Sequence, residues 1–339
     1  MDSMNTTDVV IVGAGPVGLF AVFQCGMLGL KCHVIDALPH LGGQCSALYP
    51  EKPIYDIPAY PCIEAMGLVN SLEKQAEPFQ PIYHLGQQAL TYHWDGDHFI
   101  VETDKGLHIH ARGIILAAGV GAFGPNRPPL EGIERYEGAS VFYSVTQKER
   151  FRGKKVLIAG GGDSAVDWAL ALSDIASYVG VVHRRAKFRA APDSVAQLEK
   201  LFNLGRIESV IPYQLSKLHG HDDGRLSTVE VEDLDGAVRL IDTDFLLPFY
   251  GLSMNLGPLL SWGLAMDHHT IAVDPATAQT SQSGIYAIGD ISVYPGKLKL
   301  ILTGFAEAAR AAHSLRAWLY PDEVRHFEYS TTQGVPGAR

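Results

Sequence analysis

Two stretches of the chain share one order of residues: an apolar run, a glycine-rich turn, and a longer segment with apolar positions at helical spacing. Residues 9–12 run into the turn 13–18, and residues 156–159 run into the turn 160–165. A short apolar run that stops at glycine is typical of a strand buried on both faces. The pattern therefore predicts two strand–turn–helix units of the α/β class.

Each turn has small residues at the spacing of a dinucleotide-binding loop. The first glycine permits a tight bend, the second lets backbone N–H groups approach a pyrophosphate, and the third position packs the helix against the strand. The N-terminus of the helix then faces the anion. These positions are Gly13, Gly15 and Gly18, with Pro16 opening the first helix, and Gly160, Gly162 and Ala165, with Asp163 and Ser164 opening the second.

The residue that closes the following strand differs between the two units. In the first unit it is Asp36, whose carboxylate can accept hydrogen bonds from a ribose hydroxyl. In the second it is His183, which Arg184 and Arg185 follow. Guanidinium groups bind a 2′-phosphate bidentately, whereas a carboxylate repels it. We therefore assign FAD to the first unit and NADPH to the second, with Arg189 as a further cation.

Later segments indicate how the domains are arranged. Residues 114–119 and 245–251 are apolar runs that stop at glycine, and the second turn lies between them. Apolar and polar residues alternate within 209–247, which predicts antiparallel strands. Apolar residues at helical spacing predict a helix over 300–319. We expect two Rossmann-like, three-layer domains with the NADPH domain inserted into the FAD domain, divided as 1–122, 123–248 and 249–339, with a C-terminal extension from about residue 320.

Composition excludes several other classes of protein. A chain of 339 residues with 47% hydrophobic content suits two or three domains. A net charge of −10 argues against an extended nucleic-acid surface. Residues 9–30 match a membrane span in length, but the glycine turn explains them better, and the acidic N-terminus argues against a signal peptide. We expect a cytoplasmic protein without a nucleic-acid partner or membrane segment.

The cysteines and histidines do not form a recognisable metal or disulfide pattern. The four cysteines include no C-x-x-C pair, so we expect buried free thiols. His219 and His221 have side chains of the metal-binding type but lie in a predicted turn. His108 and His110 alternate along a predicted strand, and we expect them to face solvent. No metal site is expected.

Several blocks together resemble the thioredoxin-reductase-like flavoproteins over essentially the whole chain. They are the two glycine turns, Gly42-Gly43-Gln44, His183-Arg184-Arg185 and Gly289-Asp290. The disulfide reductases of this group carry paired cysteines. Here residues 142–146 contain none, and Pro50 stands where a partner of Cys45 would lie. Residues 41–44 and 47–52 are instead similar to ferredoxin–NADP reductase of the thioredoxin-reductase-like type.

The resemblance implies the residues of both cofactor sites. The rings of Tyr49 and Tyr329 would stack on the flavin, and no acid or base residue is required, since the flavin carries the chemistry. The implied FAD contacts are Gly13, Gly15, Pro16, Gly18, Asp36, Gly43, Gln44, Tyr49, Ala89, Phe123, Asp290 and Thr331. The implied NADPH contacts are Gly160, Gly162, Asp163, Ser164, Ala165, His183, Arg184, Arg185 and Arg189.

The resemblance also implies the activity and the partners. NADPH delivers two electrons as a hydride, and FAD passes them singly to ferredoxin or flavodoxin. An NADPH-dependent flavin reductase or diaphorase with a small acceptor such as a quinone is the alternative, whereas two intact sites argue against a non-enzymatic nucleotide sensor. The family implies a homodimer. For the electron carrier we expect a local basic patch formed by Arg152, Lys154, Lys155, Lys297 and Lys299.

Overall fold

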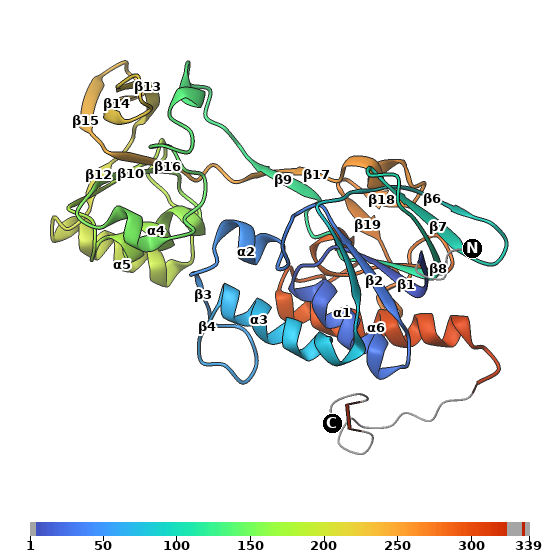
Figure 1. Ribbon diagram of the computed structural model, residues 1–339. Helices are drawn as coiled ribbons and strands as arrows, with labels where there is room; N and C mark the ends of the chain where they lie inside the picture. Colours follow the sequence, from blue (N-terminus) through green and yellow to red (C-terminus); the bar gives the residue numbers. More distant parts are fainter. Residues whose placement is uncertain (1–4, 324–333, 336–339) are drawn as a thin grey trace. The chain divides into compact units, whose positions relative to one another are not determined.

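The computed structural model describes residues 5–323 and 334–335, apart from the side chains of 122–123 and 252–254. The chain divides into two compact units (Figure 1). Unit 1 consists of residues 1–123 and 254–339, and unit 2 consists of residues 124–253. The assignment of FAD to unit 1 and of NADPH to unit 2 stays a proposal.

A mainly parallel sheet forms the centre of unit 1. Strand β1 (Thr6–Val12) pairs in parallel with β2 (Cys32–Asp36) on one side and with β8 (His108–Leu116) on the other. Beyond them, β5 (Ile82–Leu85) pairs with β2, and β20 (Ile285–Ala287) pairs with β8, both in parallel.

The apolar run at the end of β1 is buried on both faces of this sheet. Val9 and Ile11 pack in one core with helices α1 (Pro16–Met27) and α6 (Ile301–Leu319). The alternate residue Val10 packs in a second core, together with Leu256 and Leu259. Successive side chains of a strand point to opposite faces, so the uninterrupted apolar run is what a doubly covered strand requires.

Smaller elements of unit 1 surround the central sheet. The antiparallel strands β6 and β7 extend the sheet from β8, and helix α1 packs against α3 (Figure 1). These elements are α2 (Gln44–Leu48), β3 (Pro53–Ile54), β4 (Ile63–Glu64), α3 (Ala65–Ala76), β6 (Ala89–Trp94), β7 (Phe99–Thr103), β18 (Met266–Asp267), β19 (Thr270–Ala272) and β21 (Ser292–Val293).

Unit 2 repeats the parallel architecture. Its four-stranded sheet has the order β12-β11-β10-β16, and all the pairs are parallel. One face packs with the helices, and the other packs with an antiparallel three-stranded sheet, as the alternation in 209–247 predicted. The elements are β10 (Lys155–Ala159), α4 (Asp163–Leu172), β11 (Tyr178–Val182), α5 (Pro192–Asn203), β12 (Glu208–Val210), β13 (Gln214–Gly220), β14 (Leu226–Glu232), β15 (Val238–Asp242) and β16 (Phe245–Pro248).

Two short strands, β9 (Ala122–Pro125) and β17 (Leu252–Asn255), lie where the chain passes between the units, and they pair with each other. The predicted α/β class with two Rossmann-like sheets is confirmed, because β1 and β10 each lead through a glycine turn into a helix. Within the described residues, no helix is long and apolar enough to cross a membrane.

Candidate functional site

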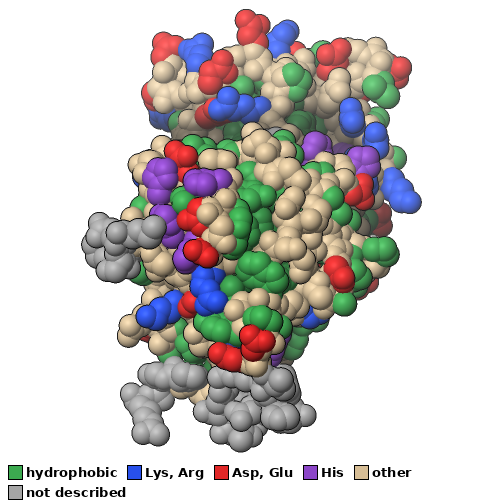
Figure 2. Space-filling view, turned by 90° about the vertical axis from the view of Figure 1, so that its right-hand side faces the viewer, with side chains coloured by type: hydrophobic (Ala, Val, Ile, Leu, Met, Phe, Trp, Pro, Cys, Tyr) green, Lys and Arg blue, Asp and Glu red, His purple; other side chains and the backbone are tan. Residues whose placement is uncertain are grey.

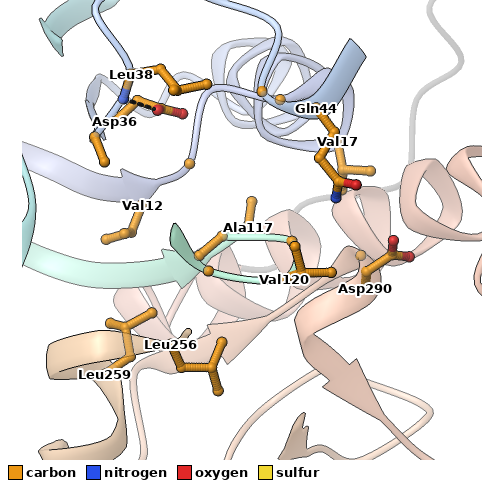
Figure 3. Close-up of a pocket in the computed structure, with 18 of the residues that line it drawn as sticks. Val12, Val17, Asp36, Leu38, Gln44, Ala117, Val120, Leu256, Leu259 and Asp290 are labelled. Carbon is orange, nitrogen blue, oxygen red and sulfur yellow. Dashed lines mark hydrogen bonds between the residues drawn. The ribbon is translucent and has the colours of Figure 1, made fainter. Parts of the chain in front are cut away.

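A pocket of about 410 Å³ opens in unit 1 where β1, β2 and β8 reach their carboxyl ends. Parallel α/β sheets bind ligands at this edge. Figure 3 shows Asp36 and Asp290 toward opposite ends of the pocket, with the amide of Gln44 pointing into it. Apolar side chains from separate parts of the chain, including Leu256 and Leu259, line one wall. The volume lies in the range of cofactor sites.

The glycines of the first turn are required by close backbone contacts. A Cβ on Gly13 would lie 2.3 Å from the carbonyl oxygen of Ala117, and a Cβ on Gly18 would lie 1.9 Å from the carbonyl oxygen of Gly13. Gly15 and Gly43 both line the pocket and lie directly against each other, since a Cβ on Gly43 would lie 3.1 Å from the Cα of Gly15. Two backbone segments without side chains thus approach each other, which is the geometry that admits a pyrophosphate.

Asp36 is held in place by the backbone around it. Its carboxylate accepts a hydrogen bond from the N–H of Ala14 at 2.6 Å and another from the N–H of Leu38 at 2.8 Å. Burial raises the pKa of this carboxyl, while the two N–H groups oppose that rise by stabilising the charged form. The side chain is therefore rigid, and further lone pairs of its oxygens can accept hydroxyl donors.

The other end of the pocket combines an aromatic ring, an acid and a thiol. Tyr49 and Asp290 both line it, and the thiol of Cys45 lies beside the Tyr49 hydroxyl. Burial raises the pKa of Cys45 to about 11, so the group stays a neutral thiol at physiological pH. The pKa of Tyr49 is also raised, mainly by burial. These groups form a polar end of the pocket with one aromatic ring.

Most of the expected FAD residues meet at this one pocket. Gly18 does not line it, because it packs the helix against the turn. For Phe123 only the backbone is described, and Tyr329 and Thr331 lie outside the described residues. The expected residues that line the pocket are Gly13, Gly15, Pro16, Asp36, Gly43, Gln44, Tyr49, Ala89 and Asp290. A glycine cradle, a fixed carboxylate and an aromatic end fit the phosphate, ribose and ring parts of FAD.

The second turn, in unit 2, has the same backbone design. Gly160 has φ +153°, and a Cβ there would lie 2.6 Å from the carbonyl oxygen of Phe249. Ala165 is fully buried, as the third small position requires. A Cβ on Gly161 would lie 2.3 Å from the ring of His183, so this ring closely covers the turn.

The residues after β11 form a loop that returns to the second turn. The N–H of Arg189 donates to the carbonyl oxygen of Gly161 at 2.7 Å, and the ring of His183 stacks on Phe188 with centroids 5.2 Å apart. Asp163 accepts a hydrogen bond from the N–H of Ala191 at 2.9 Å, which ties the loop to the start of α4. Arg184, Arg185 and Arg189 are exposed on this loop, as is Ser164 on α4.

The structure corrects four sequence-based expectations, and the first concerns His219, which lies in β13 rather than in a turn. Lys297 is not part of a basic surface patch, because its side chain is only 5% exposed and forms an ion pair with Glu307. Cys62 is exposed, although buried thiols were expected. His110 is half-buried rather than facing solvent, whereas His108 is exposed. Lys297 was misassigned because its neighbours in the sequence are polar or exposed, and its buried partner lies ten residues further on.

Side chains of the metal-binding type lie on the surface of the described part of the chain. Histidines gather with acidic side chains on part of the surface in Figure 2. Within the described part of the chain, no group of three or more His, Cys, Asp or Glu residues could hold a metal ion.

Comparisons with known proteins place the chain in a family. The family model described as pyridine nucleotide-disulphide oxidoreductase matches residues 7–313. A protein of Paramagnetospirillum magneticum named ferredoxin–NADP reductase is 59% identical over 335 residues, covering 98% of this chain and 99% of that protein. The chain belongs to the pyridine nucleotide-disulphide oxidoreductase family. A protein of the same name from Acidiphilium cryptum is 60% identical over 333 residues, covering 98% of each chain. These relatives confirm the resemblance inferred from the motifs.

Solved structures support the fold. The thioredoxin reductase of T. acidophilum matches with a TM-score of 0.78 at 24% identity, covering 92% of this chain and 98% of that one. At this identity the likeness shows the shared fold alone.

Proposed function

We propose that the protein is a ferredoxin–NADP reductase that binds FAD in the pocket of unit 1 and NADPH at the glycine turn of unit 2. The contrast between Asp36 after one turn and Arg184 and Arg185 after the other carries this proposal. The relatives of that name support it, because they match almost the full length of the chain.

In unit 1 the residues of the chain bind and orient the cofactor. Gly13, Gly15 and Gly43 would let backbone groups approach the pyrophosphate, and Asp36 would accept a ribose hydroxyl. Gln44, Tyr49, Ala89 and Asp290 would surround the remainder. When bound, FAD supplies the conversion between a two-electron donor and a one-electron acceptor. The side chains need only position the cofactor and exclude water.

In unit 2 the basic loop selects the coenzyme. Arg184 and Arg185 would bind the 2′-phosphate of NADPH, with Arg189 close to the glycine turn through its backbone. His183 covers the turn, and its pKa is lowered mainly by burial and also by the three nearby arginines, which disfavours the charged imidazolium. The site therefore uses exposed guanidinium charge rather than a protonated imidazole.

The proposed electron acceptor is ferredoxin or flavodoxin, which binds transiently through charge. With Lys297 buried, the remaining basic candidate at the pocket is Lys299, which is exposed and lines it. Leu298 and Leu300 on either side are 62% and 39% exposed. An apolar rim that carries the charge of Lys299 suits an acidic electron carrier, because electrostatic steering of the carrier needs only a local patch of opposite charge. Arg152 pairs with Glu149 and Lys155 with Asp242, which weakens their contribution.

Three further assignments belong to this proposal. We infer a homodimer and a cytoplasmic location, and light scattering of the purified protein would test the first.

The C-terminal residues Tyr329 and Thr331 are proposed to contact the flavin. Removal of the chain from residue 329 onward should change the flavin absorption spectrum and the rate of flavin reduction by NADPH, and a spectrum and rate both unchanged would contradict this role.

Anaerobic turnover with competing acceptors tests the proposed function. Purified protein with bound FAD is mixed with NADPH and, in separate reactions, with ferredoxin, flavodoxin or a quinone. We expect kcat/KM to be highest with one of the two protein carriers. Faster turnover with the quinone than with either carrier would identify a diaphorase instead, and absence of NADPH oxidation with all acceptors would refute reductase activity.

A further inference from the structure

A buried ion pair lies directly behind the Gly289-Asp290 end of the FAD pocket. The ammonium group of Lys297 contacts the carboxylate of Glu307 in the second turn of α6, and the two side chains are 5% and 1% exposed. For comparison, the ion pair between Arg206 and Asp174 in unit 2 has side chains 52% and 76% exposed. Neither member of the buried pair is among the residues that line the pocket.

Glu307 and Lys297 form hydrogen bonds with the backbone N–H and the backbone carbonyl oxygen of Gly289, respectively. Glu307 accepts a hydrogen bond from the N–H of Gly289 at 2.7 Å, and the ammonium of Lys297 donates to the carbonyl oxygen of Gly289 at 2.9 Å. Lys297 also donates to the hydroxyl of Ser292 at 3.1 Å, and Glu307 accepts from the hydroxyl of Tyr294 at 2.7 Å. The three N–H groups of the ammonium are thus all used.

The held residue shapes the pocket. Gly289 has φ +72°, a left-handed conformation, and both Gly289 and Asp290 line the cavity. The direction of the Asp290 peptide therefore depends on how Gly289 is fixed. A Cβ at position 289 would lie 3.5 Å from Val17 in α1, which is an ordinary contact, so the left-handed φ rather than a lack of space favours glycine here.

Stability alone does not explain two charges at this position. Removing two charges from water has a free-energy cost that offsets much of their mutual attraction. Apolar side chains of similar size are therefore often equally stabilising. An apolar pair, however, has no groups to bind the N–H and carbonyl oxygen of Gly289. The charges provide hydrogen bonds with defined direction, which an apolar core lacks.

We propose that Lys297 and Glu307 are positioning residues for the flavin, which act by fixing Gly289 and Asp290 at the pocket. This inference rests on the proposed binding of FAD in unit 1. It assigns a role to two side chains that touch the turn rather than the cofactor. FAD affinity and flavin reduction potential should therefore depend on the pair.

The test separates positioning from stability with Lys297→Met, Glu307→Gln and the double variant. Each single change leaves one charge buried without its partner, whereas the double change removes both charges. We measure the Kd of FAD for the apoprotein by fluorescence, the flavin midpoint potential, the absorption spectrum and the Tm. The exposed pair serves as the control through Arg206→Met with Asp174→Asn, which should leave the FAD readouts unchanged.

We expect the single variants to have a lower Tm and a Kd for FAD that is at least about tenfold higher, since hydrogen bonds to charged groups are removed. The double variant should regain Tm but not FAD affinity, because methionine cannot donate to the carbonyl oxygen of Gly289. The conservative change Lys297→Arg should retain more affinity than Lys297→Met. A double variant with wild-type FAD affinity, potential and spectrum would overturn the proposal.

A milder change keeps the test decisive if the first variants do not fold. Glu307→Asp keeps the charge but shortens the side chain by one methylene, so we expect weaker FAD binding and a shifted potential with a smaller loss of Tm than in the variants that remove a charge. Both FAD readouts at wild-type values would again overturn the proposal. Failure of the wild-type protein to reduce either ferredoxin or flavodoxin would refute the proposed function instead, while these FAD measurements would still decide the role of the pair.

Discussion

The glycine turns of the two units use the same backbone design but hold their distinguishing residues differently. Asp36 in unit 1 is half-buried and fixed by the N–H groups of Ala14 and Leu38. Arg184 and Arg185 in unit 2 are exposed on a loop that is tied back through Arg189. A hydroxyl must meet one acceptor in a defined direction, whereas a phosphate can be attracted by charge from several directions. The rigidity of each position matches the group that we propose it binds.

The largest expected effect is on the third position of the first turn. Gly18→Ala should abolish FAD binding and lower the free energy of unfolding by about 3 kcal/mol or more, because its Cβ would lie 1.9 Å from the carbonyl oxygen of Gly13. The matched control Ala165→Gly removes a buried methyl group from the start of α4 and should cost a smaller amount, about 2 kcal/mol. FAD content and thermal unfolding measure the difference. A Gly18→Ala protein that retains stoichiometric FAD and its Tm would contradict the packing argument.

The next largest effect concerns coenzyme choice. Replacement of both Arg184 and Arg185 by Ala should raise the KM for NADPH by about ten- to a hundredfold and leave the KM for NADH nearly unchanged, because only NADPH carries the 2′-phosphate. Steady-state kinetics with both coenzymes measure this. Lys187→Ala, a neighbouring exposed cation, is the matched control and should have a small effect. An equal rise in KM for NADPH and NADH would contradict the assignment of Arg184 and Arg185 to the 2′-phosphate.

A smaller effect is expected from charge at the pocket rim. Lys299→Gln should lower kcat/KM for ferredoxin about two- to fivefold at low ionic strength, and salt should reduce the difference because it screens exposed charges. Stopped-flow or steady-state rates over a salt series measure this. Lys105→Gln changes another exposed lysine of unit 1 that does not line the pocket, and it should have little effect. Ferredoxin reduction indifferent to salt would exclude this patch.

The smallest effect is expected at Cys45. Its thiol is neutral below its pKa of about 11, so Cys45→Ser should change ferredoxin-linked turnover by less than about twofold, and thioredoxin should not be reduced. Iodoacetamide at pH 8 should modify the exposed Cys62 and spare Cys45. Because the folded chain raises this pKa from 9.0, the group makes folding stability fall as pH rises from about 9 to 11. Turnover abolished by Cys45→Ser in folded, FAD-loaded protein would show that the thiol takes part.

The sequence by itself determined the short local motifs of this protein. The apolar runs, the glycine spacing and the residues Asp36, Arg184 and Arg185 lie within short segments, and their meaning depends on neighbours along the chain. The α/β class and both strand–turn–helix units followed from these segments for this reason.

Only the tertiary structure decided which distant residues share a site. Leu256 and Leu259 line the pocket across from the first turn, although no pattern marked them. The sequence around Lys297 indicates an exposed charge. In the structure, however, Glu307 in α6 pairs with Lys297 and accepts a hydrogen bond from Gly289. Burial and pairing of a charge depend on chain segments that meet only after folding, and a local pattern contains no information about that meeting.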